Sequence, residues 1–325
     1  MTRSRCCSIM SAEESREVER AIAKLKSFRD GDLGVICAIA CGKRAVPALR
    51  AMLFERECSG LYQGRCRAVE ALAVLGAHDV LIEFLETGRT IADPVERVGE
   101  DAVINAAALA LANLREQHVF EMLLRLAQRP ALTGVIGTLG AFGRVDAIPA
   151  LIDALEEDAS RPTAEAGLKK LGRPARAALL DAATRQVPSG ERESESSARQ
   201  RRSALRLLAG MRVPREIWPS LRPLMHDPDA KVAVLACEIC FDRAPAAERP
   251  KCTHRLIGLL AHEDWLLREE IEGCLVAHFD KARATIERYL NETPPSSEDR
   301  ATRSQAEIVL RRIIARARPV PQASR

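Results

Sequence analysis

The residues best suited to metal chemistry lie in the last third of the chain. Four cysteines and three histidines occur there within about forty residues and are of the types that form tetrahedral zinc sites: Cys237, Cys240, Cys252, His254, His262, Cys274 and His278. Zinc knuckles hold their cysteines on tight turns, whereas Cys237 and Cys240 fall in the middle of a predicted helix. When the helix that follows Asp229 is aligned with the next one after Asp264, Cys240 stands opposite Leu275, a position for a buried apolar side chain. We therefore predict packing, and no metal site.

The chain has ten cysteines in all. Eight of them lie in or beside predicted helices, not at the spacing of a small disulfide scaffold: Cys37, Cys41, Cys58, Cys66, Cys237, Cys240, Cys252 and Cys274. In a reducing cytosol such cysteines act as small buried hydrophobes. A reactive Cys-x-x-Cys pair needs a helix N-terminus to lower its thiol pKa, and the mid-helix pair lacks one. We predict neither redox chemistry nor a cofactor.

Basic residues are concentrated in one stretch. Residues 161–222 contain 14 Lys and Arg against six Asp and Glu, a net charge of +8. Within it, Arg173 and Arg215 occupy equivalent places at the start of successive predicted helices, as Lys43 does in an earlier one. A cation beside the positive end of a helix dipole favours an anionic partner. We predict an anion-binding set of five residues: Lys43, Arg173, Arg176, Arg215 and Arg222.

The helices that would position these residues repeat along the chain. The stretches AVPAL (Ala45–Leu49) and AIPAL (Ala147–Leu151) begin amphipathic helices with proline in the first turn, where its missing N–H needs no partner. An apolar anchor recurs in comparable helices about every 34 residues, the period of two-helix repeats. The anchors are Leu49, Phe84, Met122, Leu151, Leu179, Leu221, Leu256 and Ile286.

A second, alanine-rich type of helix lies between the anchors, with apolar residues at i, i+3, i+4 and i+7. Examples are Ala68–Gly76, Ala106–Leu114, Gly134–Gly143, Ala164–Gly172, Ser203–Gly210 and Val232–Cys240. We predict that Gly76, Gly143 and Gly172 end their helices in a left-handed conformation. Predicted start signals are a capping box of Ser11 with Glu14 and N-caps at Asp146 and Asp229.

One alanine-rich helix is also basic. Arg199, Arg202 and Arg206 share the face opposite its apolar stripe. We therefore predict that these three side chains are exposed.

The alternation of A-[VI]-P-A-L with A-x-x-A-L-x-x-L-G resembles the HEAT repeats of the phycobilisome-lyase type. The resemblance covers roughly Ala38–Leu290 and is strongest over Lys43–Leu180. It implies an all-α, armadillo-type fold: a right-handed α-solenoid of about seven to eight HEAT-like hairpins, with one helix of each pair on the concave side. We expect the helices that begin near Lys43, Arg173 and Arg215 to be the concave ones. Such repeats serve as scaffolds, chromophore lyases, hydroxylases and DNA glycosylases, so the fold alone does not choose a function.

The polar stretch VPSGERESESSA interrupts the array. We predict an exposed loop at 187–198, a repeat block on either side at 11–186 and 199–317, and disordered ends at 1–10 and 318–325. No apolar run is long enough to cross a bilayer and the first residues lack a secretory leader, so we expect a cytoplasmic protein without membrane insertion.

The enzymatic members of the family need residues that can be sought here. The hydroxylases use several His-Glu pairs, and this chain has His262-Glu263 alone. A glycosylase needs Trp or Tyr beside the damaged base and a carboxylate to assist its departure, but Trp218 is spaced with Leu221 and Met225 like a core residue. No residue argues for a chromophore lyase.

We therefore predict a non-catalytic scaffold or adaptor that binds a protein partner on its concave face, with an acidic protein as one candidate. Two alternatives stay open: a nucleic-acid-associated protein, the alkyl-base glycosylase included, and a phycobilin-lyase-like enzyme. Aromatic residues make up only 3% of the chain, which argues against stacking of single-stranded bases and leaves duplex phosphates or an acidic protein surface as the anionic partner.

Overall fold

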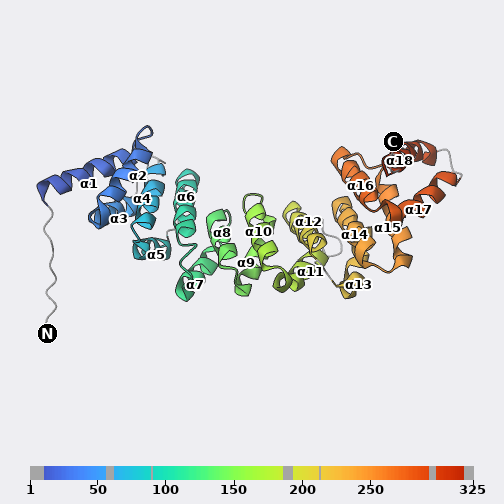
Figure 1. The fold of residues 1–325 in the computed structure, drawn as a ribbon, viewed down its shortest axis with the longest axis horizontal. Coiled ribbons are helices and arrows are strands. Elements are labelled where there is room, and N and C mark those ends of the chain that lie inside the picture. The colour runs from blue at the N-terminus through green and yellow to red at the C-terminus, as the bar shows by residue number, and fades with distance from the viewer. Residues whose placement is uncertain are drawn as a thin grey trace, which may run out of the picture. The chain divides into compact units, whose positions relative to one another are not determined.

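The computed structural model describes residues 11–55, 62–88, 91–185, 193–211, 214–292 and 298–317. These residues form helices and turns, and no strand occurs among them. The chain divides into two compact units, Met1–Leu171 and Gly172–Arg325 (Figure 1). Both predicted disordered ends, 1–10 and 318–325, lie outside the described residues.

In the first unit the helices form two layers, and successive helices alternate between them. We name the alanine-rich layer A and the other layer B. Layer A holds α2 (Gly31–Ala40), α4 (Gln63–Val74), α6 (Pro94–Ala110), α8 (Thr133–Phe142) and α10 (Arg161–Leu171). Layer B holds α1 (Ala12–Leu25), α3 (Val46–Phe54), α5 (His78–Glu86), α7 (Gln117–Leu126) and α9 (Ile148–Asp153).

The second unit repeats this alternation. Its layer A holds α12 (Glu195–Gly210), α14 (Ala230–Arg243), α16 (Trp265–Ala277) and α18 (Glu298–Ala317). Its layer B holds α11 (Arg176–Thr184), α13 (Trp218–Leu221), α15 (Arg249–Leu259) and α17 (Phe279–Asn291). The eighteen described α-helices form nine consecutive pairs, whereas the sequence predicted seven to eight helical hairpins. The pair α1–α2 was missed because it precedes the first proline motif; the right-handed superhelix remains a prediction.

The predicted anchors are all buried, and each lies on a B-layer helix. One of them was nevertheless placed a turn too late. Proline is the second residue of α3, α9, α13 and α15, and the buried residue two places after it is Leu49, Leu151, Leu221 and Cys252, respectively. In α15 the equivalent of the other anchors is therefore Cys252, and Leu256 packs one turn beyond it.

Most of the predicted helix ends are confirmed. Ser11 and Glu14 form a reciprocal capping box, and the Asp229 side chain caps α14. Gly76, Gly143 and Gly172 all have positive φ angles, but the ψ of −122° at Gly172 differs from that of a left-handed helical residue such as Gly143. The prediction for Asp146 is wrong: it lies inside a 3-10 turn and its carboxylate accepts a hydrogen bond from Arg144, 3.1 Å away, instead of capping a helix.

In the first unit, small residues let neighbouring A-layer helices approach closely. A methyl group added to Gly140 on α8 would lie 3.1 Å from Cα of Gly167 on α10. Near the start of α8, the Gly134 N–H donates to Asn105 Oδ1 on α6 at 2.8 Å. Thr138 Oγ1 donates to the Ala108 carbonyl, also on α6, at 2.9 Å. Side chains of one helix thus satisfy polar groups of the next.

In the second unit, ion pairs connect the A-layer helices at their N-termini. Asp229, the N-cap of α14, accepts from Arg202 Nε on α12 at 2.8 Å. Asp264, the N-cap of α16, lies 3.3 Å from Lys231 Nζ on α14. Each cap therefore both starts its helix and fixes that helix to the preceding one in the layer.

The structure corrects the predicted loop at 187–198 over its last residues. The Ser194 side chain caps α12, which begins at Glu195, so residues 195–198 are helical, and 186–192 lie outside the described residues. Arg201 is buried in this helix and pairs with Glu193 (2.7 Å) and with Asp227. A count of polar residues suggested an exposed loop because it could not anticipate these buried partners.

The close approach of α6 and α8 predicts opposite signs for two similar substitutions. A Cβ on Gly134 would lie 2.4 Å from the Asn105 carbonyl oxygen, so Gly134→Ala should force the helices apart and lower the free energy of unfolding by about 1–3 kcal/mol. Gly258, exposed on α15, has nothing within 4 Å of its Cβ position. Gly258→Ala should raise the free energy of unfolding by about 0.5–1 kcal/mol. Urea titration of both variants checks the pair, and destabilisation by both would contradict the packing argument.

The Arg201 cluster predicts a second stability difference. Asp227→Asn removes one of the two carboxylate charges that pair with the buried guanidinium of Arg201. The free energy of unfolding should therefore fall by about 3–5 kcal/mol. Arg206→Gln, on the exposed side of the same helix, should change it by less than about 0.5 kcal/mol. If urea titration gives the same change in the free energy of unfolding for both variants, the pairing of Arg201 with Asp227 does not stabilise the fold.

Candidate partner-binding surfaces

The predicted anion-binding residues belong to both units. Arg173 and Arg215 are exposed and are the first residues of the 3-10 turns that lead into α11 and α13. Lys43 is the exposed second residue of the corresponding turn before α3, in the first unit. The local equivalence inferred from the sequence is thus present. However, α13 has only four residues, too few to build the helix dipole on which the predicted role of Arg215 depended.

The remaining members of the set are more constrained. Arg176 is half-buried. Arg222 is exposed, and its Nε lies 3.5 Å from Glu248 Oε2. The structure thus gives Arg222 a carboxylate partner within the chain.

The charge of +8 over residues 161–222 is also partly neutralised by the fold. Arg201 and Arg202 pair with Asp227 and Asp229, which follow that stretch in sequence. Of the three arginines predicted to be exposed on α12, only Arg206 is; Arg199 and Arg202 are half-buried. The prediction failed for Arg202 because its side chain pairs with Asp229, the N-cap of the neighbouring helix, which the isolated α12 pattern does not show.

Large apolar side chains emerge instead from layer A of the first unit. Ile36 on α2, Val74 on α4 and Leu109 on α6 are 64%, 63% and 55% exposed, respectively. Leu33, Val95 and Val98 on the same helices are exposed as well. We call these six residues the apolar row. Groups of exposed apolar side chains on neighbouring helices mark interaction surfaces more often than isolated exposed side chains do.

A hollow of about 450 Å³ lies beside the apolar row, between α4 and α6. Its walls are mostly small or apolar, and they include Val69, Ala73, Val74, Ala106 and Ala110. The same lining contains the charged side chains of Arg67 and Glu70, together with the Cys66 thiol. The hollow exists because alanines face one another across the two helices, so no long side chain fills the space.

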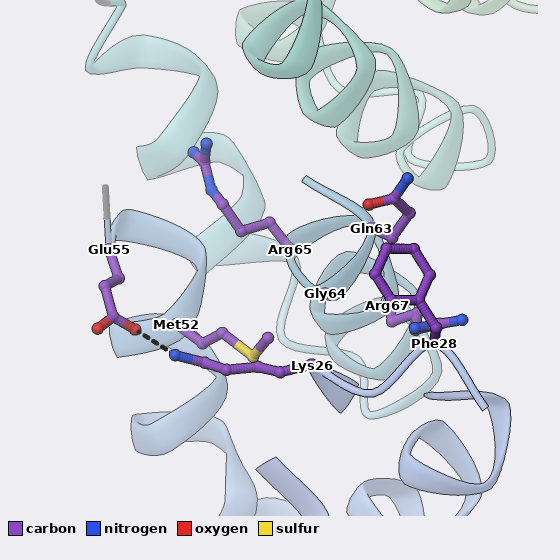
Figure 2. Close-up of a pocket in the computed structure, with 8 residues that line it drawn as sticks. All are labelled: Lys26, Phe28, Met52, Glu55, Gln63, Gly64, Arg65 and Arg67. Atoms are coloured by element: carbon purple, nitrogen blue, oxygen red, sulfur yellow. Dashed lines mark hydrogen bonds and ion pairs between the residues drawn. The ribbon is translucent and has the colours of Figure 1, made fainter. Parts of the chain in front are cut away.

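A smaller pocket lies at the connections between the first helices (Figure 2). Its volume of about 50 Å³ has room for a water molecule or two, not an organic ligand. Figure 2 shows Lys26 paired with Glu55, at 3.3 Å. Arg67 donates to the carbonyls of Leu25 (3.1 Å) and Ser27 (2.9 Å), and Arg65 Nη1 donates to Glu100 at 2.6 Å. The cations of this pocket therefore hold the chain connections in place.

A groove with a volume of about 790 Å³ lies between α16 and α18 in the second unit. Trp265 and Ile308 line it and are 62% and 67% exposed. Arg312 and Arg316 reach from α18 to Glu272 on α16. The other tryptophan, Trp218, is buried, which confirms the packing role predicted for it. The sequence pattern did not distinguish Trp265, since an N-terminal helix position fits a buried or an exposed side chain equally well.

The cysteines depart from the prediction at one place. Cys240 on α14 and Cys252 on α15 form a disulfide, so neither acts as the reduced packing residue that we predicted. The misplaced anchor hid this pairing, because Cys252 occupies the anchor position that faces α14. Cys237, one turn before Cys240, is a free thiol, and burial raises its pKa to about 12. It is therefore protonated at neutral pH and a poor nucleophile towards the nearby disulfide.

The other cysteines vary in burial. Cys41 and Cys274 are buried, Cys37 and Cys66 are half-buried, and Cys58 lies outside the described residues. Among the described residues no group of three or more His, Cys, Asp and Glu side chains is arranged to hold a metal ion. None of the helices that the structure describes combines the length and apolar character needed to cross a bilayer.

The chain is similar in part to solved structures. One is the complex of CpcE and CpcF of phycocyanin lyase from Nostoc sp. PCC7120, with a TM-score of 0.32 and 18% identity over 71% of this chain and 94% of that one. Another is an engineered protein, with a TM-score of 0.36 and 15% identity over 93% of this chain and 91% of that one. No protein-family model matches the chain, and no curated protein matches it in sequence.

The disulfide gives a prediction about stability under reducing conditions. Cys240→Ala/Cys252→Ala should lower the free energy of unfolding by about 3 kcal/mol, because a short loop loses its cross-link. Reduction of the wild-type protein with a phosphine should lower it to a similar extent and should leave the double variant unchanged. Cys237→Ala, in which a buried free thiol on the same helix is removed, should respond to the phosphine like the wild type. A wild-type protein whose urea midpoint ignores the reductant would contradict this role.

Proposed function

We propose that the chain is a non-catalytic protein-binding scaffold, built as an α-solenoid of HEAT-like hairpins, and that the outer face of layer A binds the partner. The observation that carries the proposal is the apolar row of α2, α4 and α6. Water-exposed side chains the size of Ile36 or Leu109 gain roughly 1.5–3 kcal/mol each on full burial. A partner that covers the row would recover part of that free energy.

The hollow between α4 and α6 favours an amphipathic helix as the part of the partner that binds. Helices bind in grooves through apolar residues at i, i+3, i+4 and i+7, and Val74 with the alanines of α6 offers an apolar wall for them. The exposed Glu70 carboxylate lines the same hollow. Arg67 already donates to two carbonyls of the chain and lies 3.4 Å from Asp32. We therefore expect a Lys or Arg on the partner helix opposite Glu70.

This face suits a protein better than a nucleic acid. Binding to duplex phosphates depends on rows of Lys and Arg, whereas the face is apolar around Glu70. The exposed Arg173 and Arg215 remain a separate hypothesis for an acidic partner on layer B, with Lys43, Arg176 and Arg222 as its further members. The lyase alternative has no residue of its own to support it.

Substitutions in the row test the proposal. Val74→Glu/Leu109→Glu places two charges on the A-layer face, and capture of the partner by the immobilised protein from an extract of its source organism should fall at least tenfold. The desolvation of a carboxylate against an apolar helix supplies the physical reason. Helicity and the melting temperature should stay close to those of the wild type, because both positions are exposed.

Val145→Glu is the matched control. Val145 is 53% exposed, like Leu109, but it lies in the turn before α9 on the side of layer B. It should leave capture unchanged. Arg173→Glu/Arg215→Glu tests the basic hypothesis in the same assay. Loss of capture in these two variants, with the row variant unaffected, would place the binding face on layer B and overturn the proposal.

A further inference from the structure

We propose that the groove between α16 and α18 binds an acidic amphipathic helix of a partner protein. The inference rests on the proposed scaffold function but concerns a separate surface, in the second unit. The partner helix it calls for is acidic, whereas the hollow beside the apolar row calls for a basic residue opposite Glu70.

The floor and rim of the groove provide apolar contacts. Trp265 stands at the first position of α16 and Val276 near its end, while Ile308 and Val309 line the groove from α18. Tryptophan buries more surface than other side chains and is enriched among the residues that dominate interface energies. From Trp265 to Val276 the wall of α16 extends for roughly 16 Å, about three helical turns. A helix of that length presents its apolar residues at i, i+3 or i+4, and i+7.

The charge of the groove selects the polar face of that helix. Glu272, buried on α16, accepts from Arg312 Nε at 3.0 Å and from Arg316 Nη1 at 2.7 Å. One carboxylate therefore faces two guanidinium groups, which leaves an excess positive charge. Both arginine side chains are still more than half exposed, so each can accept a second anionic partner. Arg268 and Glu269, which also line the groove, balance each other.

A partner carboxylate beside Arg312 or Arg316 would complete a charge-balanced network around Glu272. Guanidinium groups bind carboxylates through two parallel hydrogen bonds, which gives orientation as well as affinity. A duplex nucleic acid is the less favoured occupant, because Glu269 and Glu272 would face its phosphates. The groove thus combines an aromatic contact with one excess positive charge, which suits an apolar helix whose polar face is acidic.

Trp265 supplies the signal for the experiment. The chain has two tryptophans, and Trp218 is only 4% exposed, so acrylamide quenches mainly Trp265. The probe is a synthetic amphipathic helix of about 18 residues, with leucine along one face and glutamate on the other. A matched peptide has lysine in place of each glutamate. The acidic peptide should protect Trp265 saturably in the micromolar range. The basic peptide should bind at least tenfold more weakly, and the affinity of the acidic one should fall as salt increases.

Two variants locate the site. Ile308→Glu should lower the affinity for the acidic peptide at least tenfold, because it adds a negative charge to the exposed rim and leaves Glu272 unchanged. Arg316→Gln should reduce the salt dependence of that affinity, while Arg312 still pairs with Glu272. The Val145→Glu protein should bind the acidic peptide like the wild type. Circular dichroism checks that each variant is folded.

Three results would overturn the inference. Equal affinity for the two peptides would remove the role of charge, and protection of Trp265 by duplex DNA but not by the acidic peptide would identify the other class of partner. Protection that rises with protein concentration alone would show a second copy of this chain in the groove. If peptide binding fails while Val74→Glu/Leu109→Glu still abolishes capture, this inference falls and the scaffold function stands. If neither the apolar row nor the groove binds a partner, the scaffold function and this inference are both wrong.

Discussion

The structure depends on how closely the A-layer helices can approach one another. Gly140 meets Gly167 with no room for two side chains, and Gly134 donates directly to Asn105 on the preceding helix. In the second unit, Asp229 and Asp264 connect each helix to the one before it. Close packing of the A-layer helices removes apolar surface from water, so the small residues first of all stabilise the fold.

Alanines that face one another across α4 and α6 leave a hollow, and Val74 helps to line it. In the second unit, the exposed Trp265 and Ile308 line the groove between α16 and α18. The arginines that first drew attention are placed differently. Arg201 pairs with the buried Asp227 and Arg202 with the half-buried Asp229, and both pairs hold the fold together. The exposed Arg173 and Arg215 lie in turns of layer B. The proposal thus assigns stability and recognition to different residues.

The sequence predicted the alternating helices from α3 onward and their buried anchors, because proline, alanine and leucine recur with a period that only helix pairs explain. It missed the pair α1–α2 and placed the anchor of α15 one turn too late. It failed where the outcome depends on a neighbour far along the chain. The pattern contained Arg201 only as one of the 14 basic residues of 161–222 and did not show that Asp227 and Glu193 pair with it. Cys240 and Cys252 were weighed together as metal ligands and predicted to be packing residues, and the misplaced anchor of α15 hid their disulfide. Exposure of Trp265 also depends on α18, which no pattern within α16 encodes.

The central claim is that partners bind the A-layer face. Site-specific photocrosslinking tests it most directly, with a photoreactive phenylalanine analogue placed singly at Ile36, Leu109 or Ile308 on layer A and at Val145 or Arg215 on layer B, since all five positions are exposed. After irradiation in an extract of the source organism, the A-layer positions should give discrete protein adducts, and the B-layer positions should give none. Adducts from Val145 and Arg215, with none from the A-layer positions, would contradict the account.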